Sequence, residues 1–177
     1  MKIKKIVVGS LRANCYLLIS DNETVVIDPG DEVNKILKEI GRARVKYIVL
    51  THYHFDHVLT AQEIRKKTGA EILIHEQDKN FLNFPADRYL QENEEIKIGQ
   101  NILKVIHSPG HTQGSICLMG EREIFVGDLL FEDGYGRADL PGGSEEDLRN
   151  SLQKLEKILP KGTMVYPGHG DEFYDFI

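Results

Sequence analysis

The sequence predicts an α+β fold in which two mixed β-sheets pack face to face with helices on the outside. Three observations support this prediction. The chain opens with short apolar segments separated by turn residues, which is typical of an antiparallel meander. Helical periodicity then alternates with further strand-like segments. A second run of strands, a helix and a last strand follow, and sheets and helices of this kind bury their apolar faces by stacking in layers.

The first half of the chain alternates between the two periodicities. Strands are predicted at residues 3–8, 14–19, 24–27, 45–50 and 71–74, and helices at residues 33–40, 58–67 and 76–82. In the first helix, Val33, Ile36 and Ile40 share one face, and Gly41 is a suitable C-terminal stop. The third strand ends at Asp28-Pro29-Gly30, which is a turn signal.

The second half contains more strands than helices. Residues 83–93 are polar without a clear period, and we interpret them as a loop or irregular lid. Strands follow at residues 96–98, 101–106, 115–119, 123–126 and 163–166. Residues 129–143 are glycine-rich and irregular. Ser144 is a good N-cap for an amphipathic helix that Pro160 ends.

Composition limits the class of protein. A length of 177 residues predicts a single domain spanning residues 1–177. The net charge of −6 without a basic stripe argues against a nucleic-acid partner. Neither a signal peptide nor a membrane-length apolar run is evident, which predicts a cytoplasmic protein without a membrane partner. Cys15 and Cys117 are expected to be buried, reduced thiols. The sequence leaves the oligomeric state open.

A metal-binding pattern follows the strand that ends at Leu50. Within residues 52–57, four side chains can bind a metal: His52, His54, Asp56 and His57. Alternate side chains of an extended backbone point the same way, so His52 and His54 can reach one ion together. As the chain turns into a helix, Asp56 and His57 are expected at a second point nearby. Imidazole and carboxylate groups suit zinc, iron or manganese.

Three further segments place one ligand-type side chain in a turn that follows a strand. These are His111 after Gly110, Asp128 after Gly127, and His169 after Gly168. Glycine lets the backbone approach closely at such turns, and loops at a sheet edge commonly carry functional groups. We therefore expect these three residues to complete the site.

With its motifs in this order, the sequence resembles the metallo-β-lactamase-fold hydrolases, and most closely their small glyoxalase II-like (hydroxyacylglutathione hydrolase-like) members. The resemblance implies an αββα sandwich with the metals at one sheet edge. It also implies the division of the ligands: His52, His54 and His111 for one metal, Asp56, His57 and His169 for the other, and Asp128 bridging both. Asp28 would support the site without binding the ions. His75 and His107 match no ligand position and are expected at strand ends or on the surface.

The activity implied by the resemblance is hydrolysis of a thioester such as S-lactoylglutathione, or of another small ester. Two divalent ions per chain, with zinc as the first expectation and iron or manganese as alternatives, would hold a bridging hydroxide as the nucleophile. Asp56 is the candidate to orient that hydroxide and take its proton, and Asp128 is the second catalytic candidate because it would bridge the ions. No serine stands in a G-x-S-x-G context.

The loop after Asp128 is the candidate for substrate binding. Arg137 could receive a substrate carboxylate as a bidentate guest, or it could form an ion pair with Asp139 or Asp128. Tyr135 could line the pocket or pack the loop. Full-length glyoxalase II enzymes carry a C-terminal helical domain that binds glutathione. Since this sequence ends at Ile177, we expect weaker recognition of S-lactoylglutathione.

Several alternatives stay open at this point. A persulfide dioxygenase on the same fold would hold a single iron with His54, His111 and Asp128. Lactones, β-lactams or phosphodiesters are alternative substrates, although the acidic chain lacks the basic surface of nuclease relatives. A non-catalytic metal-binding module is the third alternative, and the complete set of donors argues against it.

Overall fold

The first β-sheet is built from the N-terminal half of the chain. A computed structural model describes residues 1–174, and in this part of the chain two six-stranded sheets form. The first sheet has the strands β1 (Lys2–Val8), β2 (Ala13–Ser20), β3 (Glu23–Ile27), β4 (Arg44–Val49), β5 (Glu71–His75) and β6 (Arg88–Leu90), in this order. β1, β2 and β3 pair antiparallel, whereas β3 to β6 pair parallel, so the sheet is mixed.

The second sheet is built from the C-terminal half. Its strands are β7 (Glu95–Ile98), β8 (Asn101–His107), β9 (Ile116–Met119), β10 (Glu123–Gly127), β13 (Met164–Pro167) and β14 (Phe173–Tyr174). Their spatial order is β14-β13-β10-β9-β8-β7, and β10 pairs parallel with β13. A small hairpin of β11 (Leu130–Phe131) and β12 (Gly134–Tyr135) lies apart from both sheets.

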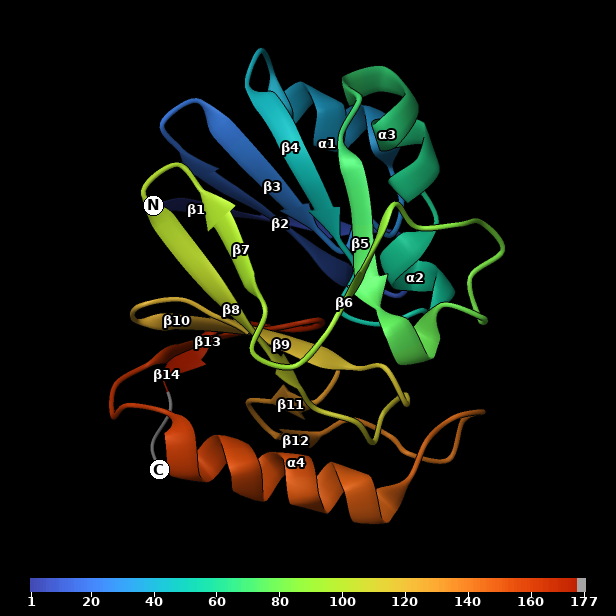
Figure 1. Cartoon of the computed structure of the whole chain (residues 1–177), viewed down its shortest axis with the longest axis vertical. Coiled ribbons are helices and arrows are strands. Elements are labelled where there is room, and N and C mark those ends of the chain that lie inside the picture. The colour runs from blue at the N-terminus through green and yellow to red at the C-terminus, as the bar shows by residue number, and fades with distance from the viewer. Residues whose placement is uncertain (175–177) are drawn as a thin grey trace.

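Helices cover the outer faces of both sheets. They are α1 (Val33–Ile40), α2 (Phe55–Val58), α3 (Ala61–Thr68) and α4 (Glu145–Ile158), with a 3₁₀ turn, η1, at Glu76–Asp78. Figure 1 shows α1 and α3 beside the first sheet and α4 along the opposite side of the molecule. None of the helices in residues 1–174 is both long enough and apolar enough to span a membrane.

The central strands are buried on both faces, which explains why strands such as β2 and β3 are almost continuously apolar, whereas β7 and β8 alternate between buried and exposed residues. In β2, Cys15 and Leu17 pack into the cluster that contains the apolar sides of α1 and α3. Tyr16 and Leu18 point the other way, into a cluster shared by the two sheets. A third cluster joins the second sheet to α4 through Leu148 and its neighbours. The predicted αββα sandwich is therefore confirmed.

Three predicted segments are wrong in their details. The helix predicted at residues 76–82 is only the 3₁₀ turn η1, Glu76–Asp78. The helix predicted at residues 58–67 is two helices, because the Thr60 backbone N–H and hydroxyl both donate to the Pro29 carbonyl, at 3.1 and 2.8 Å, and interrupt the helix. Residues 83–93 are not irregular throughout, because β6 adds a parallel edge to β5. The Asp87 carboxylate accepts the Ile72 N–H at 2.9 Å just before β6.

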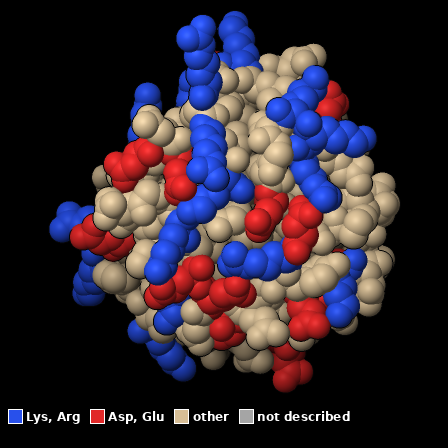
Figure 2. All heavy atoms as spheres, turned by 45° about the horizontal axis from the view of Figure 1, so that its top comes forward, with Lys and Arg blue, Asp and Glu red and all other residues tan. Residues whose placement is uncertain are grey.

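Acidic side chains lie among basic ones over much of the face shown in Figure 2. Ion pairs of the described residues include Arg88 with Glu94 and Lys46 with Glu23. Both cysteines are free and buried, as predicted.

Candidate metal centre

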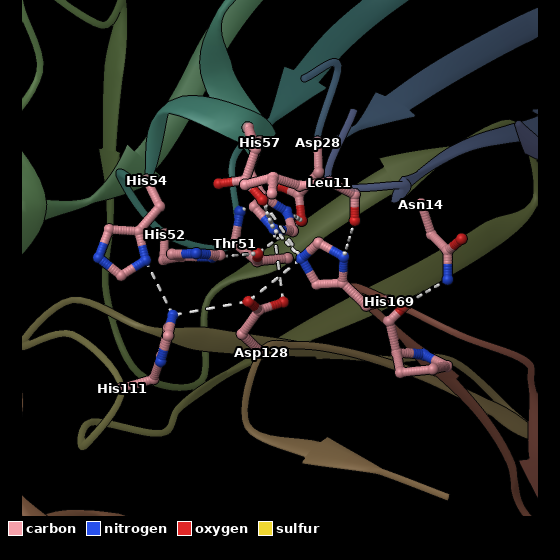
Figure 3. Close-up of polar contacts among 12 residues, drawn as sticks. Leu11, Asn14, Asp28, Thr51, His52, His54, His57, His111, Asp128 and His169 are labelled. Carbon is pink, nitrogen blue, oxygen red and sulfur yellow. Dashed lines mark hydrogen bonds and ion pairs between the residues drawn. The ribbon is translucent and has the colours of Figure 1, made fainter. Parts of the chain in front are cut away.

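Seven histidine and aspartate side chains from separate segments meet at one edge of the sandwich. His52 and His54 follow β4, and α2 carries Asp56 and His57. The second sheet contributes His111 from the loop between β8 and β9, Asp128 directly after β10, and His169 after β13. Figure 3 shows most of these side chains turned toward one another. The structure thus brings together all seven candidate metal ligands.

Three histidines form one group. His52, His54 and His111 each offer a ring nitrogen, and these nitrogens lie within 4.8 Å of one another. The closest pair is His54 Nδ1 and His111 Nε2, at 2.8 Å. His52 and His54 lie two residues apart in the bend between β4 and α2, so they meet as predicted although neither residue lies in a strand.

Asp56, His57 and His169 form a second group, whose donor atoms also lie within 4.8 Å of one another. His57 Nε2 and His169 Nε2 are 3.3 Å apart. Asp56 Oδ2 lies 3.3 Å from His169 Nε2 and 3.6 Å from His57 Nε2. The turn into α2 therefore directs Asp56 and His57 to a second point, next to the first.

Asp128 lies between the two groups. Its Oδ2 atom is 3.6 Å from His111 Nε2 on one side and 3.5 Å from His169 Nε2 on the other. Its Oδ1 atom is 3.4 Å from His57 Nε2. One carboxylate is thus within reach of two adjacent donor groups.

Four histidines use their Nδ1 atom to contact a partner outside the cluster. Those contacts are His52 with the Thr51 hydroxyl at 3.0 Å, His57 with Asp28 Oδ2 at 3.0 Å, His111 with the Arg137 carbonyl at 2.7 Å, and His169 with the Leu11 carbonyl at 3.1 Å. A carbonyl accepts only a hydrogen, so Nδ1 of His111 and of His169 carries one. Such contacts fix ring orientation and leave Nε2 free for a metal, as in known metal sites.

Asp28 lies beside the cluster, and the supporting role that the resemblance implies for it stays a prediction. Asp28 lies within 4.8 Å of His52 and His57. Its Oδ1 atom accepts the Thr51 N–H at 2.7 Å, and its Oδ2 atom accepts the Thr51 hydroxyl at 2.6 Å. Because Oδ2 also contacts His57 Nδ1, both oxygens are already engaged and Asp28 could orient the neighbouring ligands.

The electrostatics of the cluster favour a cation. Burial opposes protonation of His57, but the charges of Asp128, Asp28 and Asp56 outweigh it and raise the pKa of His57 to about 9. Burial is again the opposing cause at His169, where hydrogen bonds to Asp128 and Asp56 raise the pKa to about 10. Burial disfavours the charge of Asp128, yet the neighbouring histidines hold its pKa far below the usual value.

Two histidines of the other group, His52 and His54, are neutral at pH 7. Burial, aided by the neighbouring histidines, lowers the pKa of His52 well below its usual value and lowers that of His54 to about 4. Neutral imidazoles beside ionised carboxylates are the donor set that divalent metals such as zinc take.

Buried atoms without partners supply an independent test of fit. Among the described residues, His52 Nε2 and Asp128 Oδ1 are buried and lack a hydrogen-bond partner. Both belong to the cluster, and buried polar atoms are rarely left unpaired. Gly168 leaves the space in front of Asp128, because a Cβ atom there would collide with the Asp128 carboxylate. The residues therefore fit metal ions.

Contacts between distant segments hold the ligand loops in place. The buried Asp78 carboxylate accepts the Thr112 hydroxyl at 2.8 Å, the Gly114 N–H at 2.7 Å and the Tyr53 N–H at 3.2 Å. It thereby joins the His111 loop to the His52–His54 segment. On the other side, the Asn14 N–H donates to the Gly168 carbonyl at 2.7 Å, next to His169.

A pocket of about 500 Å³ opens over the cluster, a volume within the usual range for small-molecule sites. Its lining includes Leu11, Tyr53, Phe55, Leu140 and Pro141 as well as cluster residues. Most of this wall is apolar. The pocket therefore gives a small molecule access to the cluster beside surfaces that exclude water.

The two predicted substrate residues lie differently. Arg137 lines the pocket, but its side chain is exposed and forms a bidentate pair with Asp139, at 2.7 Å for each hydrogen bond. The ion pair with Asp139 is thus the alternative that the structure contains, and binding of a substrate carboxylate stays a prediction. Tyr135 is 67% exposed and lines a neighbouring pocket instead. Its role in substrate binding also stays a prediction.

Sequence reasoning missed several residues that build the site. Thr51 and Asp78 position ligands through hydrogen bonds, and Leu11 does so through a backbone carbonyl. The sequence offered one signal for these residues, namely that Thr51 directly precedes the histidine motif. His75, expected at a strand end or on the surface, is a buried strand-end residue that stacks on His107 with ring centres 4.0 Å apart.

Comparisons with known proteins agree with this geometry. Residues 8–169 match the metallo-beta-lactamase superfamily. The chain is 35% identical to the probable metallo-hydrolase YqgX of Bacillus subtilis (strain 168), over 97% of this chain and 92% of the relative. It is 30% identical to the probable polyketide biosynthesis zinc-dependent hydrolase PksB of the same organism, over 88% of this chain and 72% of the relative.

Solved structures are similar over nearly the whole chain. The BLEG-1 B3 metallo-beta-lactamase has a TM-score of 0.92 at 29% identity, covering 98% of this chain and 94% of that one. TTHA1623 in a di-iron-bound form has a TM-score of 0.87 at 30% identity, with coverage of 97% and 94%. ETHE1 from Myxococcus xanthus has a TM-score of 0.87 at 27% identity, with coverage of 97% and 76%. The chain belongs to the metallo-beta-lactamase superfamily, a metallo-hydrolase superfamily, and its clustered His and Asp side chains could hold metal ions.

Proposed function

We propose that the protein is a binuclear metal-dependent hydrolase that cleaves a thioester, such as S-lactoylglutathione, or another small ester. The position of Asp128 carries this proposal, because its carboxylate reaches donors of both groups, at 3.6 Å and 3.5 Å. His52, His54 and His111 would hold one ion, and Asp56, His57 and His169 the other. Zinc is the first expectation, supported by the zinc-dependent relative, and the di-iron structure keeps iron open.

When bound, the ions would supply Lewis acidity toward the substrate carbonyl and lower the pKa of a water ligand to roughly 7. The chain contributes the groups that orient and accept. Asp56 lines the pocket, and although burial opposes its charge, the hydrogen bond to His169 and the charge of His57 lower its pKa. It is therefore ionised at neutral pH and can accept a proton from the attacking water.

Metal analysis followed by turnover tests the proposal. We expect about two metal ions per chain in the purified protein, and hydrolysis of S-lactoylglutathione or small thioesters that a chelator abolishes. Asp128→Ala should lose metal and turnover together, because it removes the carboxylate shared by the two groups. Asp133→Ala, an exposed turn residue, is the matched control. Full turnover by Asp128→Ala would refute the bridging role.

A mononuclear iron persulfide dioxygenase is the second candidate, since the ETHE1 structure is similar over 97% of this chain. Such a site would use His54, His111 and Asp128, whose nearest donor atoms are 2.8 Å and 3.6 Å apart. One iron per chain, with oxygen uptake on glutathione persulfide and inert thioesters, would replace the hydrolase proposal. A chromogenic β-lactam and a lactone belong in the same panel, because BLEG-1 is a metallo-beta-lactamase.

A further inference from the structure

Helix α2 and its C-cap residue each expose one apolar side chain to solvent beside the cluster, namely Phe55 and Leu59. Phe55 and Leu59 are four residues apart, so they lie on the same side of the turn. They are 64% and 61% exposed, whereas His57 and Val58 of the same helix are buried. An isolated exposed apolar residue is ordinary, but neighbouring ones that line a common depression indicate a binding surface.

Phe55 and Leu59 form one wall of a groove of about 250 Å³. The lining also includes Phe81, which is 43% exposed and stacks on Tyr53 with ring centres 4.6 Å apart. The Tyr53 hydroxyl donates to the Pro141 carbonyl at 2.6 Å, which fixes that ring. None of the described residues that line this groove is charged, and the polar ones are Tyr53, Gln62 and Asn83.

The groove is next to the pocket over the cluster, because Tyr53 and Phe55 line both. The same pocket shares Arg137 with a cavity of about 530 Å³, whose lining also includes Asp139, Glu145 and Arg149. The cluster pocket thus has two neighbouring spaces of different character. The lining of the groove carries no charged side chain, whereas that of the cavity carries four.

We propose that the apolar groove holds the acyl chain of the substrate, so that the substrate class is a thioester or ester of a hydrocarbon-chain acid. This inference rests on the proposed hydrolase function and names its substrate class. A charged thiol such as glutathione would lose hydration without compensation in the groove, and it suits the side that carries Arg137. The acyl group then lies toward Phe55, Leu59 and Phe81. Acyl groups longer and less polar than lactoyl are expected to be preferred.

The chain-length dependence of turnover tests the proposal. N-acetylcysteamine thioesters from acetyl to octanoyl are hydrolysed by the metal-loaded protein, and kcat/KM is compared along the series. We expect a rise of about two- to four-fold for each methylene that the groove covers. Leu59→Ser and Phe81→Ser should each lower the octanoyl-to-acetyl ratio by about ten-fold. Ile102→Ser, a 46% exposed position on β8, is the matched control and should keep the wild-type ratio.

A second series assigns the occupant of the groove. Acetyl thioesters of ethane- to octanethiol lengthen the leaving group instead, and kcat/KM should stay nearly flat. A rise in this series alone would overturn the acyl assignment, as would wild-type ratios in both groove variants. If sedimentation shows a dimer that Leu59→Ser dissociates, and chain length has no effect, then a second copy of the chain covers the groove.

Binding of 2-decanone to the metal-free protein separates this inference from the proposed function, because this neutral ketone cannot be hydrolysed. We expect saturable binding by calorimetry that Leu59→Ser weakens and Ile102→Ser does not. If no thioester is turned over but this pattern holds, the hydrolase proposal fails and the apolar ligand site stands. Equal 2-decanone affinity in wild type and Leu59→Ser would refute the proposal that the groove binds an apolar chain.

Discussion

At the scale of single residues, the Thr51 hydroxyl determines the state of His52. It donates its hydrogen to Asp28 Oδ2 at 2.6 Å, so it can only accept from His52 Nδ1 at 3.0 Å. His52 Nδ1 therefore carries the ring hydrogen, and Nε2 keeps its lone pair for the cluster. Asp28 therefore influences His52 through this hydroxyl, and it influences His57 by direct contact with His57 Nδ1 at 3.0 Å.

Thr51→Val removes the hydroxyl at nearly constant shape. We expect a loss of about 1–3 kcal/mol in the free energy of unfolding, because His52 Nδ1 loses its partner in a buried site. Metal affinity should fall about 10- to 100-fold, the usual effect of removing a group that orients a ligand. Competition with a chromogenic chelator measures the affinity. Thr51→Ser keeps the hydroxyl and should restore it, and if both variants bind metal like wild type, Thr51 does not orient His52.

At the scale of elements, α4 positions the loop that carries His111. Ser144, the N-cap of α4, donates its N–H to the Gly110 carbonyl at 2.8 Å, and the Ser151 hydroxyl donates to the Pro109 carbonyl at 2.7 Å. Gly110 has a φ of 138°, and a Cβ atom there would overlap the backbone of Leu148. The loop therefore lies directly on the helix.

Gly110→Ala should separate this loop from α4. Positive φ and steric overlap both oppose the new side chain, so we expect the free energy of unfolding to fall by more than about 1 kcal/mol. Displacement of His111 should also lower the metal content, as measured by elemental analysis. Gly134→Ala is the control, because a Cβ atom there meets no neighbour within 4 Å. Unchanged metal content in Gly110→Ala would show that the loop tolerates the shift.

At the scale of the whole molecule, the metal-free protein stores positive charge on His57 and His169. Their pKa values of about 9 and about 10 lie above the ordinary histidine value of 6.5. A raised pKa contributes stability that is fully present below about pH 6.5 and is lost as the pH rises through the folded-state pKa. A bound metal would replace these protons and remove that dependence.

Thermal unfolding of chelator-treated protein between pH 6.5 and 9 tests this electrostatic balance. We expect Tm to fall as the pH rises, and to fall much less in metal-loaded protein. His169→Gln should flatten the slope of the metal-free protein. His75→Gln is the control, since burial and His107 lower the pKa of His75 to about 4, outside the window. If the Tm of the metal-free wild type does not change between pH 6.5 and 9, the raised pKa values of His57 and His169 do not contribute to stability.

How far the sequence determines the fold depends on the range of the contacts involved. The long strands and the layer pattern were predictable, because successive residues of a strand such as β2 are buried in different apolar clusters. Cys15 points into one cluster and Tyr16 into the other. The two-residue strand β14 is too short to show a period. The break before α3 depends on Pro29, thirty-one residues before Thr60, which no local pattern reveals.

The site, too, was predictable where local patterns specify it and not where contacts between distant residues do. The spacing of residues 52–57 and the three glycine turns pointed to the seven donors that the structure brings together, and their role as ligands stays a prediction. The carbonyls of Leu11 and Arg137 orient His169 and His111, and every residue type has a carbonyl. The groove beside α2 was not predicted, because Phe55 falls before the helix predicted at residues 58–67 and no local pattern reveals that Phe55 and Leu59 are exposed.

The seven donors are divided between the two sheets, four from the first and three from the second. Ions held by all of them would fasten one layer of the sandwich to the other at this edge. Force that pulls the N-terminal half away from the C-terminal half would then have to rupture coordination bonds as well as slide apolar surfaces apart. The metal centre would cross-link the two sheets, and its occupancy would determine the force needed to separate the two halves of the chain.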